Sequence, residues 1–352
     1  MLIRSSRLPV LLAVAVALCL TATGCDQFMS SAMIYLQQNP PDYEKAIVQL
    51  KEGISMVPEN GNYYRMLAYC YFNNRQYKEA RESYDNAVKL LPDKKDSLEK
   101  ARLENWDDLY RGAHTYAGKI SKAPPESLQA AVAKAQQALD NAIVFMPSND
   151  LNLMMQAFIY QQAGRAEDAR KAYLKAVEIN PQNSKAYVLL GKTAYNDTKY
   201  DQAIDYFSKA VAINPADTNS QFLLGLSFFA SKKYEQAIAP FRKANALNPD
   251  DRDALINLAK CLMLEDKTPQ LAIDPLEKAL QLKEDDETWY LLGLVALNPK
   301  VNDIDRGMRA FKRATELKPA MRDYWVSLHS IYKTKKMKAE LKLVEQKLKE
   351  LK

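Results

Sequence analysis

The chain has 352 residues, of which 47% are hydrophobic and 26% are charged, with a formal net charge of +6. Its length alone would predict roughly two or three globular domains. Only 10 glycines occur, which argues against glycine-rich phosphate loops and against folds dense in β-turns. Basic and acidic residues are interspersed along the chain, which is typical of a solvated surface and not of a nucleic-acid-binding face.

Residues 1–24 have the organisation of a signal peptide that is removed from the mature chain. Two arginines precede an apolar stretch over residues 8–20, which is too short to span a bilayer as a helix. Small residues and Cys25 follow. This ending resembles a bacterial lipobox, although Ala22 stands where leucine is usual. The resemblance implies that Cys25 carries a lipid such as palmitate and becomes the mature amino terminus. The alternative is an ordinary secretory signal with an incidental cysteine.

A lipid on Cys25 would tether residues 25–352 to a membrane of the bacterial cell envelope, through a linker of only a few residues. No later segment of the sequence is apolar enough to cross a membrane. The outer membrane, with the chain facing the periplasm, is the favoured location. Asp26 directly follows the cysteine, and in enterobacteria an aspartate there resembles an inner-membrane retention signal. The inner membrane therefore stays open as a location.

From about residue 27 a short apolar pattern returns with a fixed period. In the second unit the first apolar set has spacings of 0, 3, 4 and 7 residues, which is one face of an α-helix. A polar break and a second helical set follow, and then a proline ends the unit because it disfavours a helical residue before it. The first set is Tyr64, Leu67, Ala68 and Tyr71. The period is visible in four prolines that are each 34 residues apart: Pro147, Pro181, Pro215 and Pro249.

This pattern resembles the tetratricopeptide repeat family, and the resemblance covers nearly all of the chain after residue 26. It implies an all-α fold, an α-solenoid in the form of a right-handed superhelix of about nine helix pairs with a C-terminal capping helix. Each pair would bury its apolar face only against its neighbours, so stability depends on the interfaces between repeats. The expected units are 27–58, 61–92, 103–147, 150–181, 184–215, 218–249, 252–283, 286–319 and 322–352.

The third expected unit departs from the pattern, because Pro92 and Pro147 are 55 residues apart. Trp106 and the apolar residues that follow it at helical spacing predict the first helix of this unit. About eight of the extra residues then precede this helix. About 13 more fall in the turn after it, where adjacent prolines break the helix. This insertion at 114–127 is either a loop that contacts a partner or a tolerated lengthening of the turn.

Residues that could carry catalysis or hold a metal are few. The two histidines, His114 and His329, fall in different units, and no nucleotide-binding, hydrolase or metalloprotease motif occurs. The acidic run at 284–287 is explained by a favourable interaction with the amino-terminal dipole of the next helix. Cys70 and Cys261 occupy the same position in their units, where packed thiols are expected. We therefore expect no enzyme activity, no cofactor and no metal.

Residues one, five and eight positions after the leading residue of each first helix (offsets +1, +5 and +8) form a second face. Around the helix axis they lie at roughly 80° to 140° from the leading residue. In tetratricopeptide proteins this face lines the concave groove that holds partners. Of the 21 such positions in seven units, 15 are apolar or aromatic, which is more than exposure alone favours. They either receive an apolar segment of a protein partner or pack against neighbouring first helices. Binding is favoured, because stacking alone would leave Phe222, Leu226 and Phe229 with too little neighbouring surface to cover them all. The candidate groove residues are Tyr69, Phe72, Met154, Phe158, Tyr195, Phe222, Leu226, Phe229, Met263, Tyr290 and Leu294.

These observations favour a lipid-anchored scaffold of the cell envelope that binds protein partners and is not an enzyme. Family analogy implies a role in assembling or localising an envelope complex, such as a pilus, a secretion system, an outer-membrane protein complex or a polysaccharide exporter. The alternatives are an envelope binding protein for an apolar ligand or glycan, and a regulatory subunit of an envelope enzyme.

Overall fold

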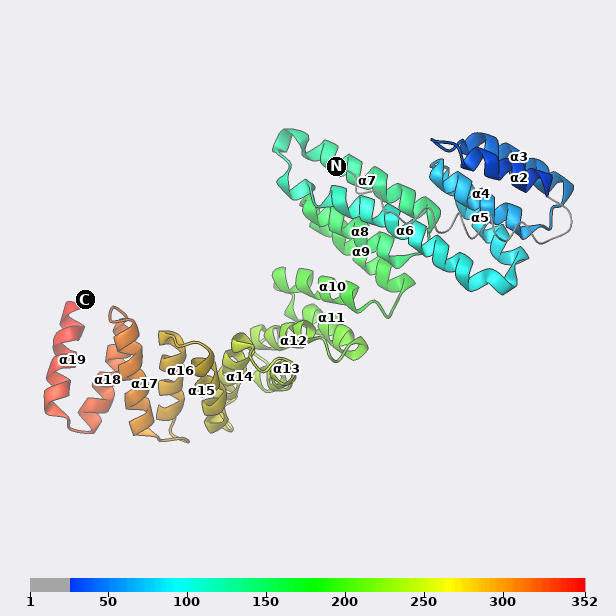
Figure 1. Ribbon diagram of the computed structural model, residues 1–352. Helices are drawn as coiled ribbons and strands as arrows, with labels where there is room; N and C mark the ends of the chain where they lie inside the picture. The colour runs from blue at the N-terminus through cyan, green and yellow to red at the C-terminus, as the bar shows by residue number, and fades with distance from the viewer. Residues whose placement is uncertain (1–25, 352) are drawn as a thin grey trace. The chain divides into compact units, whose positions relative to one another are not determined.

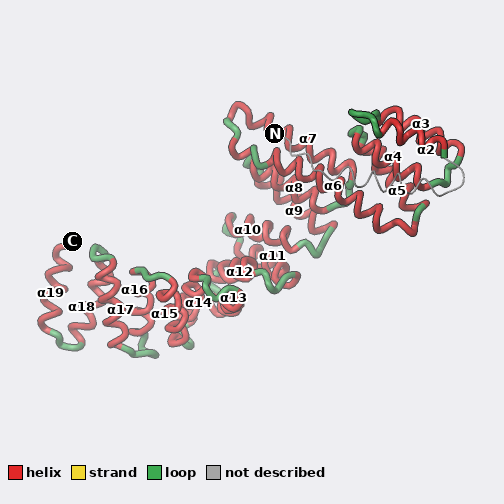
Figure 2. Tube along the Cα trace, in the orientation of Figure 1, coloured by secondary structure: helices red, strands yellow, loops and turns green. Residues whose placement is uncertain are grey.

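The computed structural model describes residues 26–351, which form eighteen α-helices and no β-strand (Figures 1 and 2). The helices form nine successive pairs, and the all-α prediction is therefore confirmed. The predicted signal peptide and Cys25 lie outside the described residues. The chain divides into two compact units that meet at Ala169 and Arg170, and each unit is described by itself.

In the first unit, helices that follow one another along the chain pack side by side as pairs (Figure 1). Short 3-10 turns separate some of them: η1 (Pro92–Lys94), η2 (Ile120–Lys122) and η3 (Pro125–Ser127). The α-helices are α2 (Gln27–Leu36), α3 (Tyr43–Met56), α4 (Gly61–Asn73), α5 (Tyr77–Leu90), α6 (Lys95–Ala117), α7 (Leu128–Phe145) and α8 (Asp150–Gln162).

The second unit continues the same alternation of first and second helices to the C-terminus. Helix α9 (Ala166–Ile179) starts just before the boundary between the units. The following elements are α10 (Ser184–Asn196), α11 (Tyr200–Ile213), α12 (Thr218–Ala230), α13 (Tyr234–Leu247), α14 (Arg252–Glu265), η4 (Pro269–Ala272), α15 (Ile273–Leu282), α16 (Asp286–Leu297), α17 (Ile304–Leu317), α18 (Arg322–Thr334) and α19 (Lys338–Glu350).

Side-chain caps and prolines set the helix ends. The first helix α14 begins where the Asp251 carboxylate accepts a hydrogen bond from the Ala254 backbone N–H at 3.0 Å, which satisfies a donor that has no partner inside the helix. The second helix α11 ends at Asn214, whose φ of −130° and ψ of 84° are non-helical because Pro215 follows. Between the two helices of seven of the nine pairs, one residue takes a left-handed conformation, as Thr198 does with φ of 60°.

The long third unit of the sequence analysis appears as two lengthened helices. Helix α6 has 23 residues and α7 has 18, whereas α10 and α11 have 13 and 14. The residues expected to precede the first helix belong to its first turns, where Leu98 is buried. Of the residues expected in the insertion, 114–117 form the last turn of α6, and later ones form η2 and η3. Ile120 of η2 is buried, so the insertion packs against the core.

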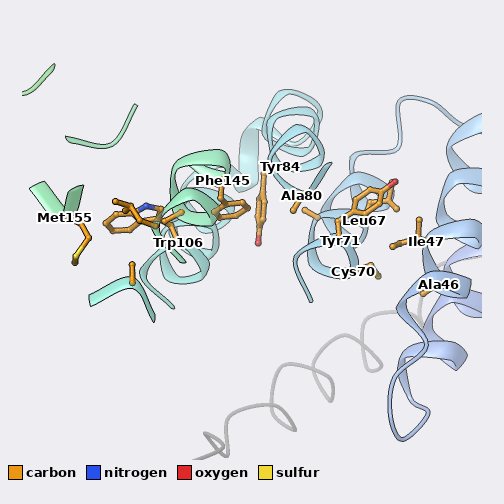
Figure 3. Close-up of a cluster of buried hydrophobic side chains, with 14 of the residues drawn as sticks. Ala46, Ile47, Leu67, Cys70, Tyr71, Ala80, Tyr84, Trp106, Phe145 and Met155 are labelled. Atoms are coloured by element: carbon orange, nitrogen blue, oxygen red, sulfur yellow. The ribbon is translucent and has the colours of Figure 1, made fainter. Parts of the chain in front are cut away.

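The core of the first unit is a continuous apolar cluster built from both members of each pair (Figure 3). Trp106 is buried in it, and its indole N–H donates to the side-chain oxygen of buried Asn152 at 3.0 Å. Cys70 is also buried there, and Cys261 is buried in the corresponding cluster of the second unit. Both thiols are free, as expected for packed cysteines. Burial raises the pKa of each to about 12.

Lysine–carboxylate pairs connect successive repeats of the second unit along their turn edge. In each pair a lysine at or beside the turn of one repeat meets an acidic residue of the repeat before it. This acidic residue lies near the start of the second helix in three pairs, and in the fourth it is the C-cap residue of the first helix α14. Because all of these side chains are exposed or nearly so, each pair contributes little by itself. The four pairs of this ladder are Lys233–Asp201, Lys267–Glu235, Lys300–Asp266 and Lys335–Asp305.

Candidate functional site

All eleven groove residues predicted from the sequence lie on first helices of their pairs. Tyr69 and Phe72 lie on α4, and Met154 and Phe158 lie on α8, so these four belong to the first unit. The other seven belong to the second unit and lie on α10, α12, α14 and α16: Tyr195, Phe222, Leu226, Phe229, Met263, Tyr290 and Leu294.

Their burial distinguishes this face from the core face of the same helices. Ten of the eleven are half-buried, and Leu294 is exposed at 38%. By contrast, the core positions of α14 and α16, such as Leu258 and Leu292, are almost wholly buried. Each residue of the predicted face therefore combines a packed side with a side that is open to solvent.

Helix α12 carries three of the candidates and shows how they are held. The sequence analysis expected Phe222, Leu226 and Phe229 to find too little neighbouring surface to cover them. Instead, the Phe222 ring lies edge-on to Phe241 with centroids 5.6 Å apart, and Phe229 lies edge-on to Tyr234 at 5.5 Å. All three, together with Met263 of α14, pack against one buried cluster. Packing within the repeats therefore covers part of each ring.

The contact between Phe229 and Tyr234 belongs to a repeated arrangement. A ring at the end of the first helix meets the first residue of the second helix at nearly the same distance in three pairs, each time edge-on. Since the second ring follows the first by five residues, the turn fixes their geometry. The three pairs are Phe72–Tyr77 at 5.6 Å, Tyr195–Tyr200 at 5.4 Å and Phe229–Tyr234 at 5.5 Å.

Tyr290 of α16 connects two successive repeats of the second unit. Its ring lies 5.4 Å from that of Phe311 on α17 and 4.8 Å from that of Tyr324 on α18, centroid to centroid. The structure does not gather all candidates of this unit into one cluster. Tyr195 packs against a cluster around Phe207, and Tyr290 packs against one around Phe311.

In the first unit the candidate rings contact residues of other pairs. Phe72 lies 5.3 Å from Phe145 of α7, and Phe158 stacks on His114 with an interplanar angle of 6° and centroids 5.8 Å apart. Tyr69 lies edge-on to Tyr43 at 6.3 Å. Burial, together with the neighbouring Tyr43 hydroxyl, raises the pKa of Tyr69 to about 12, so the phenol is neutral at physiological pH.

The charged residues on this face are all cations. Of the 21 positions at the three offsets, the charged ones are one arginine and three lysines, and none is acidic. A surface of this composition attracts acidic partners and repels basic ones. The four residues are Arg65, Lys192, Lys260 and Lys333.

Sequence reasoning missed the partners that hold the candidate rings. No role was assigned to the start of the second helix, although Tyr77, Tyr200 and Tyr234 repeat an aromatic residue there. That recurrence is the signal that could have identified them. His114, which stacks on Phe158, was also missed, although it stands at the +8 offset from Trp106 on its own first helix.

Other polar groups of the chain stabilise the fold. Among residues 26–351, no group of three or more His, Cys, Asp or Glu side chains could hold a metal ion. In the acidic run, Asp285 caps α16 by accepting from the Thr288 N–H at 3.0 Å, as the dipole interpretation expects. Glu284 accepts two hydrogen bonds from Arg313, at 2.7 and 2.9 Å, and these hold its pKa at about 2.

A hollow of about 250 Å³ lies where the insertion turns from α6 into α7. Three of its six lining residues are small, and the other three contribute one aromatic ring and two ammonium groups. Lys119 stands over the ring of Tyr116 at 5.2 Å, so part of the cationic charge is already paired with a π face. The lining residues are Tyr116, Lys119, Ser127, Ala130, Ala131 and Lys134. No helix in the described part of the chain is both long and apolar enough to span a membrane.

Three family models match parts of the chain, and two of the matches overlap. Two describe the tetratricopeptide repeat and match residues 61–94 and 154–218. The third, described as anaphase-promoting complex, cyclosome, subunit 3, matches residues 196–279. The chain therefore contains tetratricopeptide repeats. No curated protein matches its sequence.

Many solved structures resemble the chain, at low sequence identity. The crystal structure of YrrB, described as a TPR protein with an unusual peptide-binding site, is 20% identical over 52% of this chain and 93% of that one, with a TM-score of 0.46. The C-terminal part of a TPR repeat-containing protein from Cytophaga hutchinsonii is 16% identical over 86% and 99%, with a TM-score of 0.47. PilF from Pseudomonas aeruginosa is 21% identical over 60% and 96%, with a TM-score of 0.43.

Proposed function

We propose that the chain is a lipid-anchored, non-enzymatic scaffold of the bacterial cell envelope that holds a protein partner on the apolar face of its first helices. Tetratricopeptide repeats support an interaction role. The observation that carries the proposal is the row of half-buried side chains on this face, which keep one side packed and one side open. Such side chains offer apolar area to a partner without first having to be released from the core.

The packed side of these rings favours binding for a second reason. An aromatic ring that is already fixed by its neighbour loses little side-chain entropy when a partner covers it. Phe229 against Tyr234 and Tyr290 against Phe311 have this property. The face is therefore organised before the partner arrives.

The chemistry of the face defines the partner. Apolar rings interspersed with cations suit a peptide segment, helical or extended, that carries apolar residues together with acidic ones. In the proposal, Cys25 carries the lipid and the chain faces the periplasm from the outer membrane. The partner is then a component of an envelope complex whose assembly or placement this scaffold supports.

Two leucines of similar exposure allow a matched test. Leu294 lies on the proposed face with 38% exposure, and Leu282 ends the second helix α15 with 41% exposure. We expect Leu294→Glu to weaken capture of the partner from detergent extracts about tenfold or more, because it places an acidic group against an acidic, apolar segment. Leu282→Glu should capture as the native chain does, and both variants should keep native helicity by circular dichroism.

Equal capture by the two variants would exclude the proposed face. If the native chain captures no protein and instead co-purifies with a lipid or sugar, the chain is a binding protein for an apolar ligand or glycan.

A further inference from the structure

One edge of the first unit carries the most exposed large apolar side chain of the described residues. Met56, the last residue of α3, is 71% exposed, and Val57 beside it is 50% exposed. Other second helices also end in apolar residues, but these are better covered, as Leu317 shows at 40%. The exposed pair Met56 and Val57 is called the apolar edge below.

Tyr63 of α4 connects this edge to the start of α2. Its hydroxyl donates a hydrogen bond to Oδ1 of Asp26 at 2.5 Å. Its ring lies against Gly53, where an added Cβ would stand 2.6 Å from Cζ of the ring. Met56 is about one helical turn beyond Gly53. The apolar edge and the point where the chain enters α2 are therefore on the same side of the first repeat.

The chain is part of the fold from Asp26 onward. Oδ1 of Asp26 also accepts a hydrogen bond from the Met29 backbone N–H at 3.0 Å and so caps α2. The sequence analysis expected a linker of a few residues after Cys25. Since Asp26 is held by both α2 and α4, no such linker follows Cys25, and an anchor attached to Cys25 would hold the repeat itself.

We propose that the apolar edge lies in the interfacial layer of a lipid bilayer and holds the first repeat against the membrane surface. The inference rests on the proposed lipid attachment, because acyl chains on Cys25 would bring the start of α2, and with it Met56 and Val57, to the bilayer. Exposed Glu52 and Glu59 flank the edge. The contact is therefore apolar, since flanking acids gain nothing from anionic lipids.

Two experiments separate the anchor from the edge. The first labels cells metabolically with a fatty acid, and compares the full chain with its Cys25→Ser variant. The second does not depend on cellular lipidation: the chain from Cys25 is coupled through that thiol to a maleimide lipid in phosphatidylcholine vesicles that contain brominated lipid. A fluorescent residue is placed at position 56 or at position 48. Val48 is 52% exposed on the same helix, about 12 Å from Met56 along its axis, and serves as the matched control.

We expect brominated lipid to quench the fluorescence of the label at position 56 at least threefold more than that of the label at position 48. We also expect the same quenching when anionic lipid or salt is added. Equal quenching at the two positions, or no quenching at position 56, would overturn the proposal. Quenching that requires anionic lipid would also overturn it, and would indicate membrane binding through the lysine-rich α19. The proposed anchor predicts fatty-acid label on the full chain and none on Cys25→Ser. An unlabelled full chain, or a variant that keeps the label, would refute the anchor and leave the vesicle result to stand by itself.

Discussion

The ring of Phe207 lies directly against Gly191, where an added Cβ would stand 2.7 Å from Cε1 of the ring. Gly225 with Phe241 and Gly293 with Phe311 repeat the contact in the second unit, at 2.8 and 2.5 Å. In three other repeats the second helix carries tyrosine or leucine at this position, and the first helix carries alanine instead of glycine. These pairs are Ala68 with Tyr84, Ala157 with Tyr173 and Ala259 with Leu276.

Gly191→Ala should therefore destabilise the second unit. The new methyl group would meet the Phe207 ring below van der Waals distance, and overpacking of this kind costs about 1–3 kcal/mol. Urea unfolding followed by circular dichroism measures the loss. Combining it with Phe207→Leu should cost less than the two separate losses added together, because leucine leaves room for the methyl group.

Gly112 supplies the control for this prediction. It lies within α6 and has no heavy atom within 4 Å of an added Cβ. Gly112→Ala should stabilise the chain by about 0.5–1 kcal/mol, because alanine loses less backbone entropy in a helix. If both alanine variants shift the unfolding midpoint in the same direction, the close approach of Gly191 and Phe207 is not a determinant of stability.

Tyr63→Phe should destabilise the first repeat. The substitution removes the hydroxyl that donates to Asp26, and a hydrogen bond to a charged group contributes about 1.5–3 kcal/mol. Asp26→Ala removes both this bond and the cap of α2. A double-mutant cycle in urea measures the coupling between the two residues, which should exceed about 1 kcal/mol. Additive losses would show that the two side chains do not interact in solution.

Much of this fold follows from spacing alone. Leu190, Gly191 and Ala194 are all buried. Their spacing places them on the same face of the helix, and the neighbouring helices cover that face. Pro215 marks the end of α11 for a local steric reason that needs no tertiary information. Such signals act within a few residues, and sequence reasoning can read them.

The remaining features depend on contacts that join distant residues. Asp26 and Tyr63 are 37 positions apart, and no local rule pairs them. Helix α6 extends back to Lys95 because Leu98 finds a buried place in the core, which the repeat pattern could not indicate. At the candidate site, spacing predicted the face, but the rings that cover Phe222 and Phe229 belong to second helices.

The lysine–carboxylate ladder of the second unit should make its stability sensitive to acid and salt. Lys233 hydrogen-bonds Asp201 and holds the pKa of that carboxyl below its ordinary value of 3.8. The pair therefore stabilises fully above pH 3.8, and its contribution is lost as pH falls through the lower folded-state pKa. Replacing the four ladder lysines with methionine should weaken the salt dependence of the unfolding midpoint. An unchanged salt dependence would show that the ladder does not form in solution.

The buried cysteines report on the two units separately. Cys70 lies in the first unit and Cys261 in the second, and burial raises the pKa of each thiol to about 12. In a chain with Cys19 and Cys25 replaced by serine, both should resist a thiol reagent without denaturant, because thiolate is scarce and access is blocked. Each should react as its own unit unfolds in urea. Rapid labelling of either thiol in the native chain would contradict the packing described for that unit.

The central claim is that the apolar face of the first helices binds a protein partner, and site-specific cross-linking in cells tests it directly. A photoreactive residue at position 294 lies on that face, and one at position 282 lies on a second helix with similar exposure. The account predicts one defined adduct with another protein from position 294 and none from position 282. The same adducts from both positions, or adducts from position 282 alone, would contradict it.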